Sequence, residues 1–168
     1  MSSERLLLAV LAGCGMTHAP TAVEEPRATP AAEQLVVTLQ RTICFGHCPA
    51  YVVTIDGDGV VRWTGTTDVA AKGERRGIVS RDQLAQLSAA IDRARFFELD
   101  PYGHLPCTEP NGLCSDTICS DGSDSIVTVR RAGIVHRIDN AHCEPSPADA
   151  LEDLIDKLAD TDRWVGHP

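Results

Sequence analysis

Residues 51–64 read YVVTIDGDGVVRWT, and this stretch decides the fold. Two runs of β-branched and aromatic residues, at 51–55 and 60–64, predict two strands. Asp56-Gly57-Asp58-Gly59 lies between them and predicts a tight turn, because its two glycines can adopt positive φ angles. The stretch is therefore expected to form a hairpin, and a hairpin predicts an antiparallel sheet.

Further strands are expected on both sides of this hairpin. Leu35, Val37 and Leu39 alternate with polar or mixed residues, which predicts a first strand that reaches Ile43. The other runs typical of strands are 69–79, interrupted at Lys72-Gly73-Glu74, and the pair 125–130 and 134–139 around Ala132-Gly133.

Two helices follow from capping signals and from the helical spacing of apolar residues. Ser80 and Gln83 form a capping-box pair, which predicts a helix that starts there and ends near Phe96. Ser146 and Pro147 are typical of the N-cap and first residue of a last helix. The residues expected on the buried faces are Leu84, Leu87 and Ile91 in the first helix and Leu151, Leu154, Ile155 and Leu158 in the second.

These elements predict an α+β fold, an antiparallel sheet of about five to six strands with two helices packed on one face. Trp164 is expected to fold back and close the core. The order contains no repeating strand–helix–strand units, so a Rossmann or thioredoxin topology is not expected. Residues 34–168 are therefore expected to form a single domain.

The composition sets limits on function. The chain has 168 residues, of which 43% are hydrophobic and 23% charged, and its formal net charge is −9. These values are typical of a folded soluble domain. The acidic balance argues against a nucleic-acid partner, which requires a basic surface. No apolar run approaches the roughly 20 residues that span a bilayer, so no transmembrane helix is expected.

The first residues carry a targeting signal. Leu11-Ala12-Gly13-Cys14 resembles the lipobox of bacterial lipoproteins, and it follows a charged start and a short apolar run. The resemblance implies that residues 1–13 are a signal peptide and that Cys14 is lipidated after cleavage. The alternative is a buried N-terminal helix with a cysteine there by chance.

The segment after Cys14 fits a membrane-anchored domain. Residues 14–33 combine Pro, Ala, Thr and Glu with almost no apolar periodicity, which predicts a flexible tether. The expected location is the cell envelope. The resemblance implies the outer membrane rather than the inner, because Gly15 stands where an Asp marks retention in the inner membrane of Gram-negative bacteria.

The sharpest local pattern is Cys44-Phe45-Gly46-His47-Cys48-Pro49-Ala50-Tyr51. It resembles the signature of a bacterial family known as domain of unknown function 6438, and the similarity extends over about residues 35–165. Other matching segments are Trp63–Gly65, Phe96-Phe97, Cys119–Gly122, Cys143, Ile155-Asp156 and Trp164. Departures are Ser123, where the family commonly has Pro, and an added loop at 107–114. The resemblance implies a secreted or lipid-anchored domain and no particular catalytic residue, substrate or cofactor.

The cysteines predict disulfide bonds. After cleavage and lipidation of Cys14, an even number of thiols is left, which in an oxidising compartment favours three disulfides. Spacing favours Cys44 with Cys48, and the register of the second hairpin brings Cys119 near Cys143. Cys107 and Cys114 would then pair within the long loop, although other connectivities stay open.

A metal or redox site is the alternative use of these cysteines. Cys44-x-x-x-Cys48-Pro49 also resembles the motif of Sco-type copper-delivery proteins, and Cys44, His47 and Cys48 could form a soft site for Cu(I) or Zn²⁺. Those proteins place the motif at the start of a helix, whereas a strand follows it here. A structural disulfide is therefore favoured over metal binding or thiol exchange.

Other polar groups have simpler explanations. Asp56–Gly59 lacks the further ligands of a calcium loop, so it is expected to be a turn. No nucleophile motif or phosphate-binding glycine loop accompanies the histidines. The groups expected to be surface or satisfied core residues are His104, His136 and His142, and an acidic loop cluster of Asp116, Asp121 and Asp124.

The function expected from the sequence is a non-catalytic binding or interaction module of the cell envelope, held by disulfides and without a cofactor. Its partners would be the membrane, through the lipid anchor, and an unidentified envelope protein, peptidoglycan fragment or small molecule. The alternative is an envelope metal-binding or thiol–disulfide protein that uses Cys44, His47 and Cys48.

Overall fold

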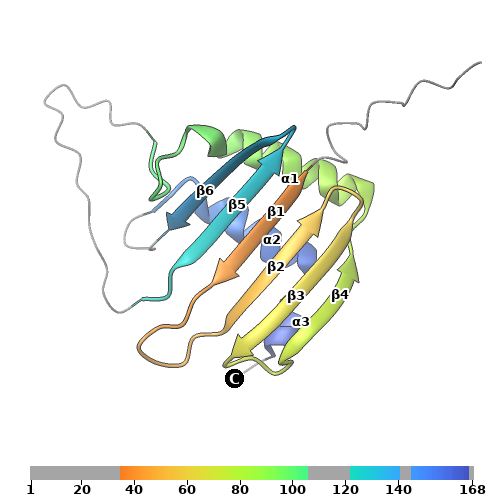
Figure 1. Cartoon of the computed structure of the whole chain (residues 1–168), viewed down its shortest axis with the longest axis vertical. Coiled ribbons are helices and arrows are strands. Elements are labelled where there is room, and N and C mark those ends of the chain that lie inside the picture. Colours follow the sequence, from red (N-terminus) through yellow and green to blue (C-terminus); the bar gives the residue numbers. More distant parts are fainter. Residues whose placement is uncertain (1–34, 106–121, 141–144, 167–168) are drawn as a thin grey trace, which may run out of the picture.

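The computed structural model describes residues 35–105, 122–140 and 145–166. Within them, six strands form one antiparallel sheet in the order β4-β3-β2-β1-β5-β6 (Figure 1). The strands are β1 (Val36–Arg41), β2 (Ala50–Asp56), β3 (Val60–Thr67), β4 (Gly73–Ile78), β5 (Ser125–Arg131) and β6 (Ile134–Asn140). The helices are α1 (Arg81–Arg93), the 3₁₀ turn η1 (Phe96–Glu98), α2 (Asp149–Ala159) and α3 (Asp162–Val165). The predicted α+β fold is confirmed.

The helices cover one face of the sheet, and the core lies between the two layers. Figure 1 shows α1, α2 and α3 all behind the strands. Side chains that point to this face are buried, as at Val37 and Leu39 in β1 and Val53 and Ile55 in β2. Their neighbours along each strand are less buried, which is the alternation that a sheet with one covered face requires.

Helix α1 begins after Ser80, as the sequence predicts, but it ends before the predicted end near Phe96. The Ser80 hydroxyl accepts a hydrogen bond from the backbone N–H of Gln83 at 3.2 Å, and the Gln83 side chain accepts one from the N–H of Ser80 at 2.8 Å. The helix ends at Arg93, because Arg95 adopts a left-handed conformation with φ of 51°. Phe96 therefore belongs to η1, where its ring is buried in the core.

Helix α2 begins later than its sequence predicts. Its first residue is Asp149, so the prediction that Ser146 is the N-cap was wrong. The Ser146 hydroxyl donates to the carbonyl of Gly103 at 2.7 Å and accepts from the N–H of Ala148 at 3.1 Å. Ser146 and Pro147 therefore form a turn that fastens the start of α2 to the loop after η1.

Three aromatic rings fill the core beside α3. Trp63 is fully buried, with the ring of Tyr51 at 5.8 Å and that of Trp164 at 5.4 Å between centroids. Trp164 thus folds back onto the sheet, as the sequence predicts. Gly65 faces the Trp63 indole from two residues along β3, and a Cβ atom there would lie 2.1 Å from that ring. The Trp-x-Gly spacing therefore makes room for the indole.

A Gly65→Ala substitution is expected to lower the free energy of unfolding by about 3 kcal/mol, because the Trp63 indole would have to move in a packed core. Urea unfolding followed by tryptophan fluorescence measures the change. Gly122→Ala is the matched control, since nothing lies within 4 Å of a Cβ placed there. Equal stability of the two variants would show that the indole has room to spare.

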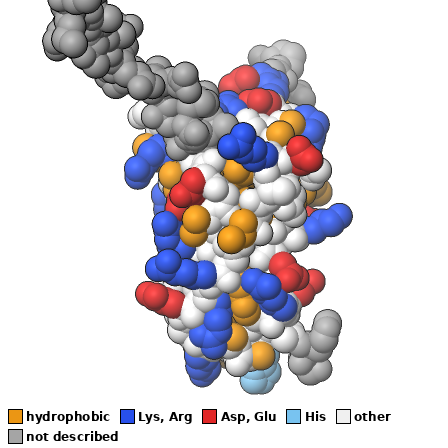
Figure 2. Space-filling model, turned by 90° about the vertical axis from the view of Figure 1, so that its right-hand side faces the viewer, with side chains coloured by type: hydrophobic (Ala, Val, Ile, Leu, Met, Phe, Trp, Pro, Cys, Tyr) orange, Lys and Arg blue, Asp and Glu red, His pale blue; other side chains and the backbone are white. Residues whose placement is uncertain are grey.

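The two edges of the sheet are protected in different ways. At β6, the backbone N–H of Asp139 donates to the carbonyl of Pro101 at 2.7 Å, so the loop after η1 covers part of that edge. Strand β4 exposes Glu74, Arg75 and Arg76. Figure 2 views the molecule from the β4 side, where Lys and Arg side chains are spread among scattered hydrophobic ones. Such charges disfavour pairing with the edge of another sheet.

None of the helices within the described residues is long and apolar enough to cross a membrane.

Candidate functional site

The Cys44–Cys48 loop connects β1 to β2 at one end of the sheet. The two cysteines form a disulfide with a Cα–Cα distance of 5.7 Å, the pairing expected from their four-residue spacing. The N–H of Gly46 donates to the carbonyl of Cys44 at 2.9 Å, which closes a tight turn inside the ring. The loop therefore has a small covalent ring at its tip.

Hydrogen bonds fix both ends of this loop, where it joins β1 and β2. On the β1 side, the N–H of Thr42 donates to the carbonyl of Asp124, and the Thr42 hydroxyl accepts from the N–H of Asp124. On the β2 side, the Thr66 hydroxyl donates to the carbonyl of Ala50 at 2.9 Å. The disulfide and these bonds fix the loop while leaving its outer side chains uncovered.

The uncovered side chains are mostly apolar. Phe45 is 94% exposed and Ile43 is 67% exposed, although both are large hydrophobic residues. The side chain of His47 is 97% exposed, and its Nδ1 lies 3.7 Å from a carboxylate oxygen of Asp68. The loop thus presents an aromatic ring and an imidazole to the surroundings.

The disulfide leaves the loop without the thiolate ligands that the alternative metal site requires. Both sulfurs are bonded to each other, so neither is available as the thiolate that a soft metal ion binds. Across the part of the chain that the structure describes, no group of three or more His, Cys, Asp or Glu residues could hold a metal ion.

A Cys44→Ser/Cys48→Ser double variant is expected to lose about 2 kcal/mol of stability, because the unfolded chain gains freedom when a short loop is opened. His47→Ala should leave the unfolding midpoint unchanged, since the imidazole is exposed. Thermal unfolding and elemental analysis of both proteins test this. Zinc or copper in the parent protein that disappears in His47→Ala would contradict a structural role for the loop.

A buried cluster of charges lies directly behind the loop. Arg41, the last residue of β1, donates from one terminal nitrogen to Glu152 and from the other to Asp156, both at 2.9 Å. The Nε of Arg41 also donates to Asp156 at 3.3 Å. Burial of the guanidinium acts to lower the pKa of Arg41, but the two carboxylates of α2 outweigh it and the pKa is raised. Arg41 therefore stays charged and joins α2 to the sheet.

Glu152 is the deepest member of this cluster. It is fully buried, and its carboxylate accepts hydrogen bonds from the Ser125 hydroxyl and from the Asn140 amide at 2.9 Å, besides the bond from Arg41. The Asn140 amide also donates to Asp149 at 2.8 Å. These hydrogen bonds and the ion pair with Arg41 offset the free-energy cost of removing the Glu152 carboxylate from water. The cluster is therefore compatible with a stable core.

Asp156 connects the cluster to the surface. Its carboxylate accepts from the Tyr51 hydroxyl at 2.7 Å and from the Thr161 hydroxyl at 3.1 Å. Burial, followed by the negative charge of Asp156, raises the pKa of the Tyr51 phenol well above its ordinary value. A phenol held in its protonated state in this way is a hydrogen-bond donor and a poor base or nucleophile.

The phenol of Tyr51 is expected to ionise only at strongly alkaline pH. In a Tyr102→Phe variant Tyr51 is the one remaining tyrosine, so its ionisation can be followed by ultraviolet absorbance. Because the folded pKa is raised, the stabilising effect of Tyr51 is complete below about pH 10 and is lost as the pH rises beyond it. Tyr51→Phe should remove that alkaline loss. Ionisation of Tyr51 near pH 10 in the folded protein would contradict the buried contact with Asp156.

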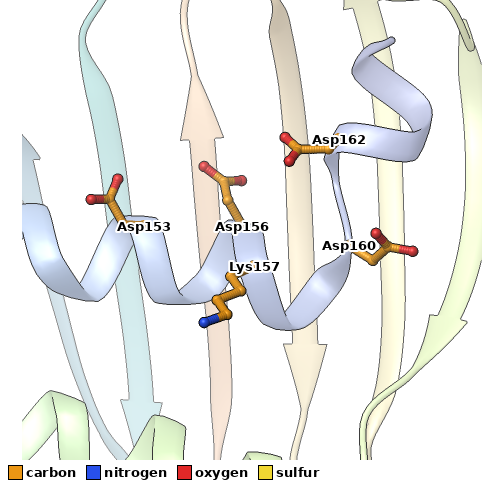
Figure 3. Close-up of a pocket in the computed structure, with 5 residues that line it drawn as sticks. All are labelled: Asp153, Asp156, Lys157, Asp160 and Asp162. Atoms are coloured by element: carbon orange, nitrogen blue, oxygen red, sulfur yellow. The ribbon is translucent and has the colours of Figure 1, made fainter. Parts of the chain in front are cut away.

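A groove of about 310 Å³ lies between the loop and the helices, and a second depression shares two of its lining residues. Cys48 and Pro49 line the groove on the loop side, and Asp156, Asp162 and Val165 on the helix side. The adjoining depression, of about 500 Å³, shares Asp156 and Asp162 with it and adds three side chains, Asp153, Lys157 and Asp160. In Figure 3, the carboxylates of Asp153, Asp156 and Asp162 lie on one side of the α2–α3 segment and Lys157 points to the other. The rim formed by the two together has more carboxylates than cations, although Arg41 lines the groove and Lys157 the depression.

The structure describes some of the residues singled out in the sequence and not others. Cys44, His47 and Cys48 lie in the loop, but His104 and His136 lie elsewhere, the first 3.5 Å from Asp100 and the second 3.0 Å from the carbonyl of Leu99. Outside the described residues are Cys14, Cys107, Cys114, Cys119, Cys143, His142, Asp116, Asp121, the signal peptide and the tether.

Sequence reasoning missed the charge cluster behind the loop. Arg41, Tyr51, Glu152 and Asp156 are brought together from the first two strands and the last long helix. One signal was available, because Glu152 follows Leu151 on the apolar side of α2 and lies one turn before Ile155. A carboxylate in such a position indicates a buried partner.

A family model described as domain of unknown function, DUF6438, matches residues 35–159. This stretch includes the Cys44–Cys48 loop, Arg41, Tyr51 and Asp156. No curated protein matches the sequence.

Proposed function

We propose that this chain, which belongs to the DUF6438 family, is a non-catalytic interaction module of the bacterial cell envelope. Its recognition surface consists of residues 43–49 together with the adjoining groove. The observation that carries this proposal is the exposure of Ile43 and Phe45 on a loop that a disulfide closes. Large hydrophobic side chains exposed on a fixed loop are typical of interaction sites.

The chemistry of the groove supports recognition rather than catalysis. Arg41 and Tyr51 both donate hydrogen bonds to Asp156, which also accepts one from Thr161. These hydrogen bonds hold the polar side chains of the groove in one arrangement. The raised pKa of the Tyr51 phenol makes it unsuitable as a general base near neutral pH. A preorganised polar surface of this kind binds without having to order its side chains first.

The proposed anchor is the lipidated Cys14, followed by the tether of residues 14–33. Val36, where β1 begins, and the 42–49 loop lie at opposite ends of that strand (Figure 1). A tether that enters the domain near Val36 would therefore be attached at the end of the strand opposite the recognition surface.

Side-chain oxidation by hydroxyl radicals tests the proposed surface. The full chain is labelled in intact envelopes and again after purification in detergent, and labelling is compared at Phe45 and at Ile78, which is 85% exposed near the end of β4. We expect Phe45 to be protected in the envelope and Ile78 to be labelled equally in both samples. Equal labelling of Phe45 in both would contradict the proposal.

Thiol–disulfide exchange is the second candidate, and one observation favours it. Cys48 lines the groove, so a small thiol could approach its sulfur there. Cysteines that exchange disulfides usually have their pKa lowered by a helix N-terminus or a cation. Here β2 follows the loop instead of a helix, and Arg41 is engaged by two carboxylates. Recognition is therefore the function that the geometry supports better.

A further inference from the structure

We infer that the partner of this surface is a protein with an apolar pocket that accepts the Phe45 ring and with lysine or arginine side chains around that pocket. This inference rests on the proposed function and adds to it the chemical class of the partner. It is carried by two features of the described residues, namely the exposed ring and the acidic rim.

Phe45 is suited to act as the anchor of an interface. It is the most exposed of the large hydrophobic residues in the described part of the chain, at 94%. Ile43 lies two residues before it, on the other side of Cys44, and is also exposed. The disulfide and the bonds at Thr42 restrain the loop in the free protein, so little freedom is lost when it binds. Aromatic anchors that enter a pocket dominate the affinity of many protein interfaces.

The rim beside this anchor selects a basic partner. Cys48 and Pro49 share the groove with Asp162, and the adjoining depression adds the exposed Asp153 beside Lys157. Asp160 also lines the depression, but it pairs with Arg163 at 3.5 Å. Asp68, which follows β3, lies 3.7 Å from the imidazole of His47 in the loop. Arg41 and Asp156 form an ion pair with each other, so the negative charge of the rim comes mainly from Asp153 and Asp162. Complementary charge around the pocket would set the orientation of the partner and its rate of association.

The same features argue against a lipid surface or a second copy of the chain. Loops and helices that bind membranes usually present lysine and arginine, because the lipid surface is negatively charged. Here carboxylates outnumber the lysine and arginine side chains that line the groove and the adjoining depression. Two copies that met through this surface would bring their acidic rims together, in a chain whose net charge is −9. A basic protein surface would be attracted to the acidic rim, whereas an anionic lipid surface or a second copy of the chain would be repelled by it.

The test uses the photoreactive amino acid p-benzoylphenylalanine, placed at Phe45 or at Ile78 of the full-length chain. Both variants are irradiated in the cells from which the protein comes, and the adducts are identified by mass spectrometry. Position 78 is the control because Ile78 is also well exposed, at 85%, but lies at the other end of the sheet from the loop. It pairs with Val60, the first residue of β3, on the side of the sheet where β1 begins. We expect one protein to be joined to position 45 and not to position 78.

The captured protein is then purified and its affinity measured with defined variants. Phe45→Ala should weaken binding at least about tenfold, whereas Ile78→Ala should have no effect. Asp153→Asn should weaken binding about threefold and reduce its dependence on salt, because one attractive charge is removed. Each variant replaces an exposed side chain, so an unchanged unfolding midpoint shows that the fold is intact.

Several outcomes would overturn the inference. Adducts of position 45 with lipid or glycan, or the same adducts at both positions, would exclude a protein pocket for Phe45. Binding that is unchanged in Phe45→Ala, or strengthened in Asp153→Asn, would do the same. If Phe45 is protected from radicals in the envelope but joined to lipid or glycan, the proposed recognition surface stands and the inferred partner is wrong. If Phe45 is not protected, the proposed function itself fails.

Discussion

An Arg41→Met substitution is expected to lower the free energy of unfolding by about 3–5 kcal/mol. The guanidinium donates to both Glu152 and Asp156, and Glu152 is fully buried. Without Arg41 the buried Glu152 carboxylate would lose the ion pair that it makes with the guanidinium. Urea unfolding at neutral pH, followed by the fluorescence of Trp63 and Trp164, measures the loss.

The matched control is Arg62→Met. Arg62 pairs with Asp56 on the exposed side of the sheet, where water screens the charges, so its loss should cost about 1 kcal/mol or less. A double variant, Arg41→Met with Glu152→Gln, should recover part of the stability lost in Arg41→Met, because the uncompensated charge is gone. A loss below about 1 kcal/mol in Arg41→Met would show that the cluster does not hold α2 against the sheet.

A Cys14→Ser substitution is expected to move the protein from the membrane fraction to the soluble fraction, or to stop its processing. The proposed lipid chains are attached through this cysteine, and two or more chains are needed for stable attachment. Fractionation of cells followed by immunoblotting measures the distribution, and metabolic labelling with a fatty-acid analogue measures the lipid itself.

The control for this experiment is Met16→Ser, which leaves Leu11-Ala12-Gly13-Cys14 intact. It should be labelled and should remain in the membrane fraction. If Cys14→Ser is distributed like the parent protein, and if the parent carries no lipid, the proposed anchor is wrong. The fold described for residues 35–166 does not depend on that result, since Cys14 is not among the residues that the structure describes.

Local signals were sufficient to predict the sheet and the first helix. The turn at Asp56–Gly59 and the alternation in residues 51–64 predict the β2–β3 hairpin, in which Val53 pairs with Trp63. Ser80 and Gln83 act over three residues, so their capping box can be recognised without knowledge of the fold. Ser146 misled because its hydroxyl does accept a local bond, from the N–H of Ala148, but that bond belongs to a turn, and α2 begins only at Asp149.

The candidate site depended on contacts that are distant in sequence. Arg41 and Glu152 are 111 residues apart, and Tyr51 and Asp156 are 105 apart, so no motif contains both members of a pair. The cysteine spacing did predict the closed loop, because Cys44 and Cys48 are only four residues apart. The exposure of Phe45 could not be predicted, because the same aromatic residue next to a strand is usually buried.

The mass of the intact chain, isolated from membranes without reductant and treated with a thiol-alkylating reagent, tests the central proposal most directly. We expect a chain that begins at Cys14, carries lipid and has Cys44 and Cys48 protected from alkylation by their disulfide. A chain with an unmodified Cys14, or with Cys44 and Cys48 alkylated and copper or zinc bound before treatment, would contradict it.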